Sequence, residues 1–105
     1  MNLVTGATGL LGSYVAKLLI DKGEIVRAIK RNTSDVSLLG NYAERIEWLQ
    51  GDVLDIPSLE EAMNGVEKVY HCAAVISFIP SEVEYMMKVN VEGTANVMNT
   101  ALASG

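Results

Sequence analysis

Apolar residues fall in short blocks along the chain, and their spacing predicts strands that alternate with helices. Leu3 and Val4 close a short apolar run, whereas residues 11–19 carry apolar side chains at helical spacing until Lys22 and Gly23 interrupt it. The β-branched residues in 24–29 and the apolar run 66–74 are typical of buried strands. We therefore expect strands at residues 3–4, 24–29, 46–49 and 66–74, and helices at about 11–22, 36–43, 57–65 and 81–103.

Two of the expected helices have a serine near their start, with a glutamate three residues later. Ser58 with Glu61 opens the helix that begins at Pro57, and Ser81 with Glu84 opens the last helix. In such a capping box, the two side chains bond to backbone amides that lack a helical acceptor. We expect these two pairs to define where the helices start.

The order of strands and helices predicts the fold class. Strands joined by helices pair in parallel through right-handed crossovers, and the helices then cover both faces of the sheet. The chain has 105 residues with no obvious repeat or linker, which indicates one domain over residues 1–105. The expected class is α/β, a doubly wound parallel sheet of about four strands. Ligands of such sheets bind at the carboxyl ends of strands, where the glycine-rich and polar loops of this chain fall.

Three glycines, Gly6, Gly9 and Gly12, separate the first expected strand from the first helix. The first permits a tight exit from the strand, the second lets a phosphate approach the backbone, and the third lets helix and sheet pack closely. Free amides and the positive dipole end of the helix favour a pyrophosphate there, and a Cβ at Gly9 should obstruct it. A flexible glycine-rich turn is the alternative, but the strand before and the helix after favour a dinucleotide site.

Four segments resemble the extended short-chain dehydrogenases/reductases, which include sugar-nucleotide epimerases and dihydroflavonol reductases. The TGxxGxxG motif of that family is similar to "TGATGLLG" at 5–12, and its adenine-binding segment is similar to "GDVLD" at 51–55. The strand that ends beside the cofactor resembles "VYHCAAV" at 69–75, and the signature of the next helix resembles "VNVEGTANV" at 89–97. The stretches "HCAAVISF" at 71–78 and "VNVEGTANVMNTAL" at 89–102 look most like dihydroflavonol-reductase-like and related epimerase members. The resemblance spans nearly the whole chain and implies a Rossmann-type fold.

The same resemblance implies a cofactor site built from these segments. In it, Asp52 holds the adenine amino group, and Asn90 fixes the local backbone or the catalytic loop. For Asp52, a turn or a helix cap after the strand is the alternative role. The residues expected to contact the cofactor are Gly6, Thr8, Gly9, Leu10, Leu11, Gly12, Lys30, Arg31, Asp52, Val53, Ala73, Ala74, Val75 and Asn90.

Two basic residues, Lys30 and Arg31, end the second expected strand, where a protein that prefers NAD carries a carboxylate for the ribose 2′-hydroxyl. A carboxylate would repel a 2′-phosphate, whereas the Arg31 guanidinium can bind it in a planar fork and Lys30 can add a point charge. This pattern favours NADP(H) over NAD(H). The alternative is a solvated surface pair, for example with Asp35.

His71 and Cys72 lie within the last expected strand. No second metal ligand is evident near His71, so we expect a structural histidine that supports the backbone, and no metal site. The single cysteine cannot form an internal disulfide, and its apolar surroundings favour a buried residue over a reactive thiol.

The catalytic Tyr-x-x-x-Lys pair of the family has no match in this chain, so we assign no catalytic residue. Tyr14 with Lys17 and Tyr85 with Lys88 are spaced by three and lie in other motifs, which is typical of ordinary helix residues. The chain therefore resembles the cofactor-binding first part of an enzyme whose catalytic and substrate-binding portions lie elsewhere. In the complete enzyme, hydride would pass to or from a small carbonyl or sugar-nucleotide substrate, and this chain alone should be inactive.

Two other functions remain open on the sequence. One is a non-catalytic dinucleotide-binding or redox-sensing module that keeps the fold without the chemistry. The other is assembly of a homodimer through the last helix, which the resemblance implies; packing of that helix on the sheet is the alternative. An apolar stripe there would comprise Val83, Met86, Met87, Val91 and Met98.

The formal net charge of −5 argues against general nucleic-acid binding, which needs a basic surface. The longest nearly apolar run, residues 69–79, is too short and too polar to span a bilayer, so we expect no membrane partner. The N-terminus lacks the pattern of a signal peptide, and we therefore expect a cytoplasmic protein.

Overall fold

Four parallel strands form one sheet in the computed structural model, which describes residues 1–32, 34–72 and 88–104. The strands are β1 (Asn2–Thr5), β2 (Val26–Lys30), β3 (Ile46–Gln50) and β4 (Lys68–His71), in the spatial order β3-β2-β1-β4. Asn2 of β1 is in register with Val26 on one side and with Lys68 on the other. The strand order reverses at β1, as in a doubly wound sheet, and the predicted Rossmann-type fold is confirmed.

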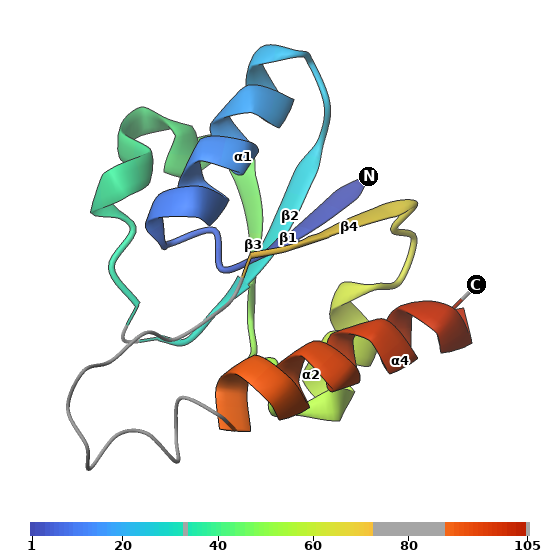
Figure 1. The fold of residues 1–105 in the computed structure, drawn as a ribbon. Helices are drawn as coiled ribbons and strands as arrows, with labels where there is room; N and C mark the ends of the chain where they lie inside the picture. Colours follow the sequence, from blue (N-terminus) through green and yellow to red (C-terminus); the bar gives the residue numbers. More distant parts are fainter. Residues whose placement is uncertain (33, 73–87, 105) are drawn as a thin grey trace, which may run out of the picture.

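Helical segments cover both faces of this sheet (Figure 1). On one face lie α1 (Leu10–Asp21) and the 3₁₀ segment η1 (Ser37–Arg45), and on the other lie α2 (Ile56–Ala62) and α4 (Thr94–Ser104). A π-helical turn, η3 (Lys88–Gly93), leads into α4. Within the described parts of the chain, no helix combines the length and the apolar character that crossing a membrane requires.

Each face of the sheet has its own apolar core. Val4 belongs to the core under α1 and η1, and the adjacent Leu3 belongs to the core under α2 and α4; both are fully buried. Side chains alternate along a strand, so consecutive residues of β1 serve the two cores. This two-sided burial explains why the strand reads as a short continuous apolar run.

The strand boundaries differ from the prediction at β2 and β4. Strand β2 begins at Val26 rather than at residue 24; Glu24 and Ile25 belong to the connection from α1, where Ile25 is 65% exposed. Strand β4 begins at Lys68 rather than at residue 66 and ends at His71. Of the expected remainder of that strand, residues 73 and 74 lie outside the described residues.

The capping box predicted for the helix at 57–65 is wrong. Helix α2 begins at Ile56 with Asp55 as its N-cap, and no side chain caps it. Pro57 lies in the first turn of α2. Proline is tolerated there because the amide hydrogen that it lacks would have no helical acceptor. The Ser58 hydroxyl lies 2.7 Å from the Asp55 carbonyl oxygen and accepts a hydrogen bond from the Asp52 amide. The Ser58 hydroxyl therefore links α2 to the loop that precedes it. The second predicted box, at residues 81 and 84, lies outside the described residues.

The helix expected at residues 36–43 forms 3₁₀ turns instead of a regular α-helix. Gly40 adopts a positive φ of 55°, which breaks the segment in two. The second half is attached to α1, because the Tyr42 hydroxyl donates to Asp21 at 2.8 Å and the Lys17 ammonium lies 5.9 Å from the Tyr42 ring centre. The hydrogen bond to the Asp21 carboxylate raises the pKa of Tyr42.

Candidate functional site

The glycine turn after β1 has the tight geometry that its sequence predicts. Gly6 adopts a positive φ of 72°, and its carbonyl oxygen accepts the Gly9 amide at 3.0 Å. A Cβ on Gly12 would lie 1.9 Å from the same Gly6 oxygen. Gly12 is therefore required for close packing of α1 against the turn itself, which sharpens the predicted role in packing helix against sheet.

Helix α1 begins without a side-chain cap on its first amides. Gly9 is the N-cap, the first turn has no acidic residue, and the first helical acceptor, the Gly9 oxygen, is used by Ser13. Leu10 and Leu11 are 81% and 64% exposed at this end. Among the described residues, a Cβ on Gly9 would contact only the Gly6 oxygen, at 3.4 Å, so this part of the chain leaves the space over Gly9 open. Uncapped amides and the helix dipole together suit an anion.

A cleft of about 470 Å³ lies beside the carboxyl ends of β2 and β3. It brings together two residues that the sequence analysis placed in the cofactor site, Arg31 and Asp52. Gly51 and Asp55 also line it and belong to the segment "GDVLD", whereas Asn32 and Gln50 had not been singled out. The lining comprises Arg31, Asn32, Gln50, Gly51, Asp52 and Asp55.

Asp52 forms a turn and also faces this cleft. Its Oδ1 accepts the Leu54 amide at 3.0 Å, so the turn-forming role is present. Among the described residues, Oδ2 has no partner, which leaves one carboxylate oxygen for a ligand donor. The neighbouring Val53 is only 6% exposed, and its carbonyl accepts a hydrogen bond from Asn96. The Val53 side chain belongs to the core, so this residue can offer a ligand only its backbone.

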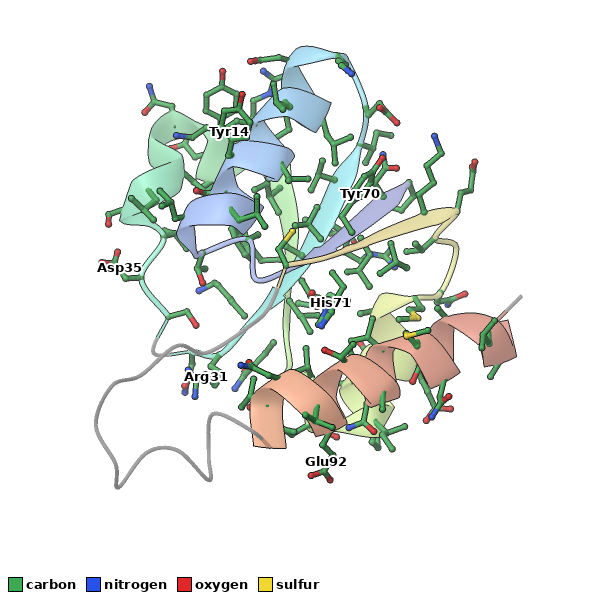
Figure 2. All side chains as sticks on the ribbon, in the orientation of Figure 1. Tyr14, Arg31, Asp35, Tyr70, His71 and Glu92 are labelled. Atoms are coloured by element: carbon green, nitrogen blue, oxygen red, sulfur yellow. The ribbon has the colours of Figure 1, made fainter. Side chains whose placement is uncertain are left out.

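The two basic residues that end β2 point in different directions. The Lys30 ammonium lies 5.7 Å from the Trp48 ring centre, whereas the exposed Arg31 lines the cleft. The alternative pair of Arg31 with Asp35 does not form, because the two side chains lie well apart (Figure 2); Asp35 instead accepts the Ser37 amide at 2.9 Å. Of Lys30 and Arg31, which the sequence predicts to bind the 2′-phosphate, Arg31 lines the cleft.

His71 links three elements at the carboxyl ends of β1 and β4. Its Nδ1 lies 2.6 Å from the Thr5 hydroxyl, and its Nε2 lies 2.9 Å from the Thr94 hydroxyl at the start of α4. Thr94 donates in turn to the Asn90 carbonyl at 2.6 Å. Figure 2 shows His71 on the side of the sheet that faces α4. Partial burial lowers its pKa. The predicted structural role is confirmed, and sequence reasoning missed Thr5 and Thr94.

Cys72 is half-buried rather than buried, like the residues before it in β4, which is an edge strand of the described sheet. Its amide donates to the Thr5 hydroxyl at 3.1 Å, and burial raises the pKa of its thiol. A raised pKa disfavours the reactive thiolate, as the sequence analysis expected. The predicted cofactor contacts of Ala73, Ala74 and Val75 lie outside the described residues.

The tyrosine–lysine pair on α1 does not form a dyad. Tyr14 is 62% exposed on the helix surface (Figure 2), and Lys17 lies over the ring of Tyr42. Tyr85 lies outside the described residues. Within the described residues, no group of three or more His, Cys, Asp or Glu side chains is placed to hold a metal ion.

Comparison with known proteins agrees with this geometry. Residues 2–105 match the NAD dependent epimerase/dehydratase family. "Sterol demethylase protein B" of Methylococcus capsulatus is 42% identical over 104 residues, 99% of this chain and 31% of that protein. "Cinnamoyl-CoA reductase 1" of Petunia hybrida is 39% identical over 103 residues, 93% of this chain and 30% of that protein.

A solved structure shares the arrangement of strands and helices. It is a short-chain dehydrogenase/reductase superfamily protein from Agrobacterium tumefaciens with bound NAD, and it matches with a TM-score of 0.83 and 33% identity. The match covers all of this chain and 30% of that one. The chain thus spans about three-tenths of the length of the relatives that it matches. Its glycine motif, its fold and these matches agree: the chain belongs to the NAD dependent epimerase/dehydratase family.

Proposed function

We propose that this chain binds NADP(H) as the cofactor-binding portion of an NAD(P)-dependent reductase or sugar-nucleotide epimerase. The observation that carries the proposal is the uncapped start of α1 after β1, together with the cleft at the ends of β2 and β3 that contains Arg31 and Asp52. The pyrophosphate would bind at the backbone amides of Leu10 and Leu11. These amides are uncapped and lie at the positive end of the helix dipole. The adenine amino group would donate to Asp52.

The preference for a 2′-phosphate rests on Arg31. The solved relative from Agrobacterium tumefaciens contains NAD, so the family fold itself does not select the phosphorylated cofactor. Here a planar guanidinium lines the cleft at the end of β2, where an NAD-preferring protein places a carboxylate. Lys30 is held near Trp48 and would contribute much less. This arrangement supports NADP(H) over NAD(H).

Calorimetric titration of Arg31→Ala with NADPH and with NADH tests this assignment. A charge-assisted hydrogen bond is worth roughly 1.5–3 kcal/mol, so NADPH affinity should fall about 10- to 100-fold. NADH affinity should change little. Lys30→Ala is the matched control and should retain most of the NADPH affinity. Equal losses for NADPH and NADH in the Arg31 variant would contradict the 2′-phosphate role.

In the complete protein, the bound cofactor would exchange hydride with a small carbonyl or sugar-nucleotide substrate. The 105-residue chain should not oxidise NADPH in the presence of ketones, aldehydes or sugar nucleotides, because no tyrosine of its sequence precedes a lysine by four residues. Cofactor oxidation by the chain alone would refute this. An in-frame Tyr-x-x-x-Lys encoded after Gly105 would support the enzyme, whereas a stop codon there would support a non-catalytic module.

The last helix also offers a surface for a second copy of the chain. Met98 and Leu102 on α4 are 59% and 78% exposed, and Val91 on the preceding η3 turn is 66% exposed. Val97, by contrast, is buried in the core against the sheet, as the packing alternative predicts. Three predicted members of the stripe, Val83, Met86 and Met87, lie outside the described residues. Sedimentation analysis should find a dimer that Met98→Glu dissociates; an unchanged mass would refute it.

A further inference from the structure

The hydrogen bonds around His71 have one direction, which the chemistry of the groups determines. The Thr94 hydroxyl has a single hydrogen, and the Asn90 carbonyl 2.6 Å away can only accept, so Thr94 donates to Asn90. The Thr94 oxygen must then accept from His71, whose Nε2 lies 2.9 Å away. The hydrogen of the imidazole is therefore on Nε2.

The other side of the ring has the complementary arrangement. In a neutral imidazole with hydrogen on Nε2, Nδ1 is an acceptor, and the Thr5 hydroxyl donates to it at 2.6 Å. The Thr5 oxygen also accepts the Cys72 amide at 3.1 Å. The bonds run from Cys72 through Thr5, His71 and Thr94 to Asn90. Burial lowers the pKa of His71, which agrees with a neutral ring.

The position of this network follows from the strand order. The cleft with Arg31 lies beside β2 and β3, and the glycine turn follows β1. If the adenine half of a dinucleotide lies in the cleft and its pyrophosphate lies at the glycine turn, its nicotinamide half reaches the end of β4. Thr5 and His71 are the last residues of β1 and β4, and they are partners in the sheet register. The network thus lies away from the adenine half.

The η3 turn is fixed from two sides. On one side Thr94 connects it to His71; on the other, Gly93 packs so closely on Val53 that a Cβ would lie 2.6 Å from the Val53 side chain. Asn96 adds a hydrogen bond to the Val53 carbonyl at 3.0 Å. The bond to His71 thus links this turn to the ends of β1 and β4, whereas the contacts of Gly93 and Asn96 link it to the side of the adenine cleft.

We propose that His71, as the neutral tautomer with hydrogen on Nε2, is a positioning residue for the nicotinamide half of the cofactor. It acts through Thr94, which holds the η3 turn and the Asn90 backbone against the ends of β1 and β4. The proposal rests on the proposed function, since it presumes that a dinucleotide crosses these strand ends. The adenine half binds independently of this network.

Thr94→Val tests the proposal because valine keeps the shape of threonine and removes the hydroxyl; Thr94→Ser, which keeps it, is the matched control. Calorimetry of the 105-residue chain would use NADP⁺ and adenosine 2′,5′-bisphosphate, which carries only the adenine half. Thr94→Val should bind NADP⁺ about tenfold more weakly, as expected for one lost hydrogen bond. It should bind the bisphosphate like the wild type, and Thr94→Ser should restore NADP⁺ binding.

A second measurement needs no variant. His71 is the only histidine of the chain, so ¹⁵N NMR of its imidazole is unambiguous, and at neutral pH it should show hydrogen on Nε2. Hydrogen on Nδ1 or a charged ring would overturn the proposal. So would a Thr94→Val protein that binds NADP⁺ normally or loses both ligands equally. Wild-type protein that binds neither ligand would instead refute the proposed function, and this inference with it.

Discussion

Gly12→Ala is expected to destabilise the fold by pushing α1 away from the glycine turn. The added Cβ would lie 1.9 Å from the Gly6 oxygen, 2.5 Å from the Gly6 carbonyl carbon and 2.9 Å from the Ala7 nitrogen. All three are backbone atoms, so no side-chain rotation relieves the overlap. The separation from the oxygen is about 1.5 Å short of ordinary van der Waals contact. The start of α1 must therefore move.

The magnitude follows from two opposing effects. Overpacking of a well-packed site costs about 1–3 kcal/mol. Alanine favours helix over glycine by up to about 1 kcal/mol, which offsets part of that cost. Because the overlap is with backbone atoms, the upper end of that cost applies, and a net loss of about 2 kcal/mol remains. This corresponds to a melting temperature lower by roughly 8–16 °C for a domain of this size.

Gly9→Ala is the matched control, because it adds the same methyl group to the same turn. Among the described residues, its Cβ would meet only the Gly6 oxygen, at 3.4 Å, and its φ of −87° suits alanine. We expect unfolding by heat or urea, followed by circular dichroism, to show at most about 1 kcal/mol of destabilisation, from the weaker N-cap. NADPH binding should nevertheless be lost, because the methyl group would occupy the path of the pyrophosphate.

The two variants therefore separate packing from ligand binding. A Gly12→Ala protein as stable as the wild type would refute the packing role of that glycine. A Gly9→Ala protein that binds NADPH with wild-type affinity would refute the pyrophosphate site above Gly9.

Three further predictions concern side chains outside the glycine turn. Arg27→Met should lower the free energy of unfolding in urea by about 1–3 kcal/mol, because Arg27 donates to two carbonyls at the end of α2 and pairs with Glu47; unchanged stability would contradict this. The lowered pKa of His71 means that the unfolded chain binds the proton more tightly, so stability should fall as pH drops below about 6.5. His71→Asn should lack this component, and an identical pH profile would disprove it. Burial raises the thiol pKa of Cys72, so a disulfide reagent should react with it more slowly in folded than in unfolded protein, and equal rates would refute the assignment.

The parts of the fold that local sequence determines could be predicted. Gly6, with its positive φ, and the alternation of apolar strands with amphipathic helices are readable from neighbouring residues. The start of α2 could not be predicted in this way, because the same residues can form a capping box or place a proline in the first turn. Ser58 bonds to the preceding loop instead, through a contact that the spacing alone does not reveal.

The candidate site was only partly readable for a similar reason. Lys30 and Arg31 are adjacent in sequence, yet Lys30 lies near Trp48 while Arg31 lines the cleft. The partners of His71 lie 66 and 23 residues away along the chain, so no local pattern identifies Thr5 or Thr94. Such contacts depend on strand order and on the placement of α4, which the fold determines.

The central claim, that a dinucleotide crosses the carboxyl ends of these strands, is tested most directly by a ¹H–¹⁵N NMR titration of the chain with NADP⁺. We predict saturable shifts at the amides of the glycine turn and of the cleft, around Leu10, Leu11, Arg31 and Asp52. No saturable shift would contradict the claim. So would shifts confined to the groove of about 410 Å³ between α2 and α4, lined by Ile56, Glu60, Asn96, Asn99, Thr100 and Ala103.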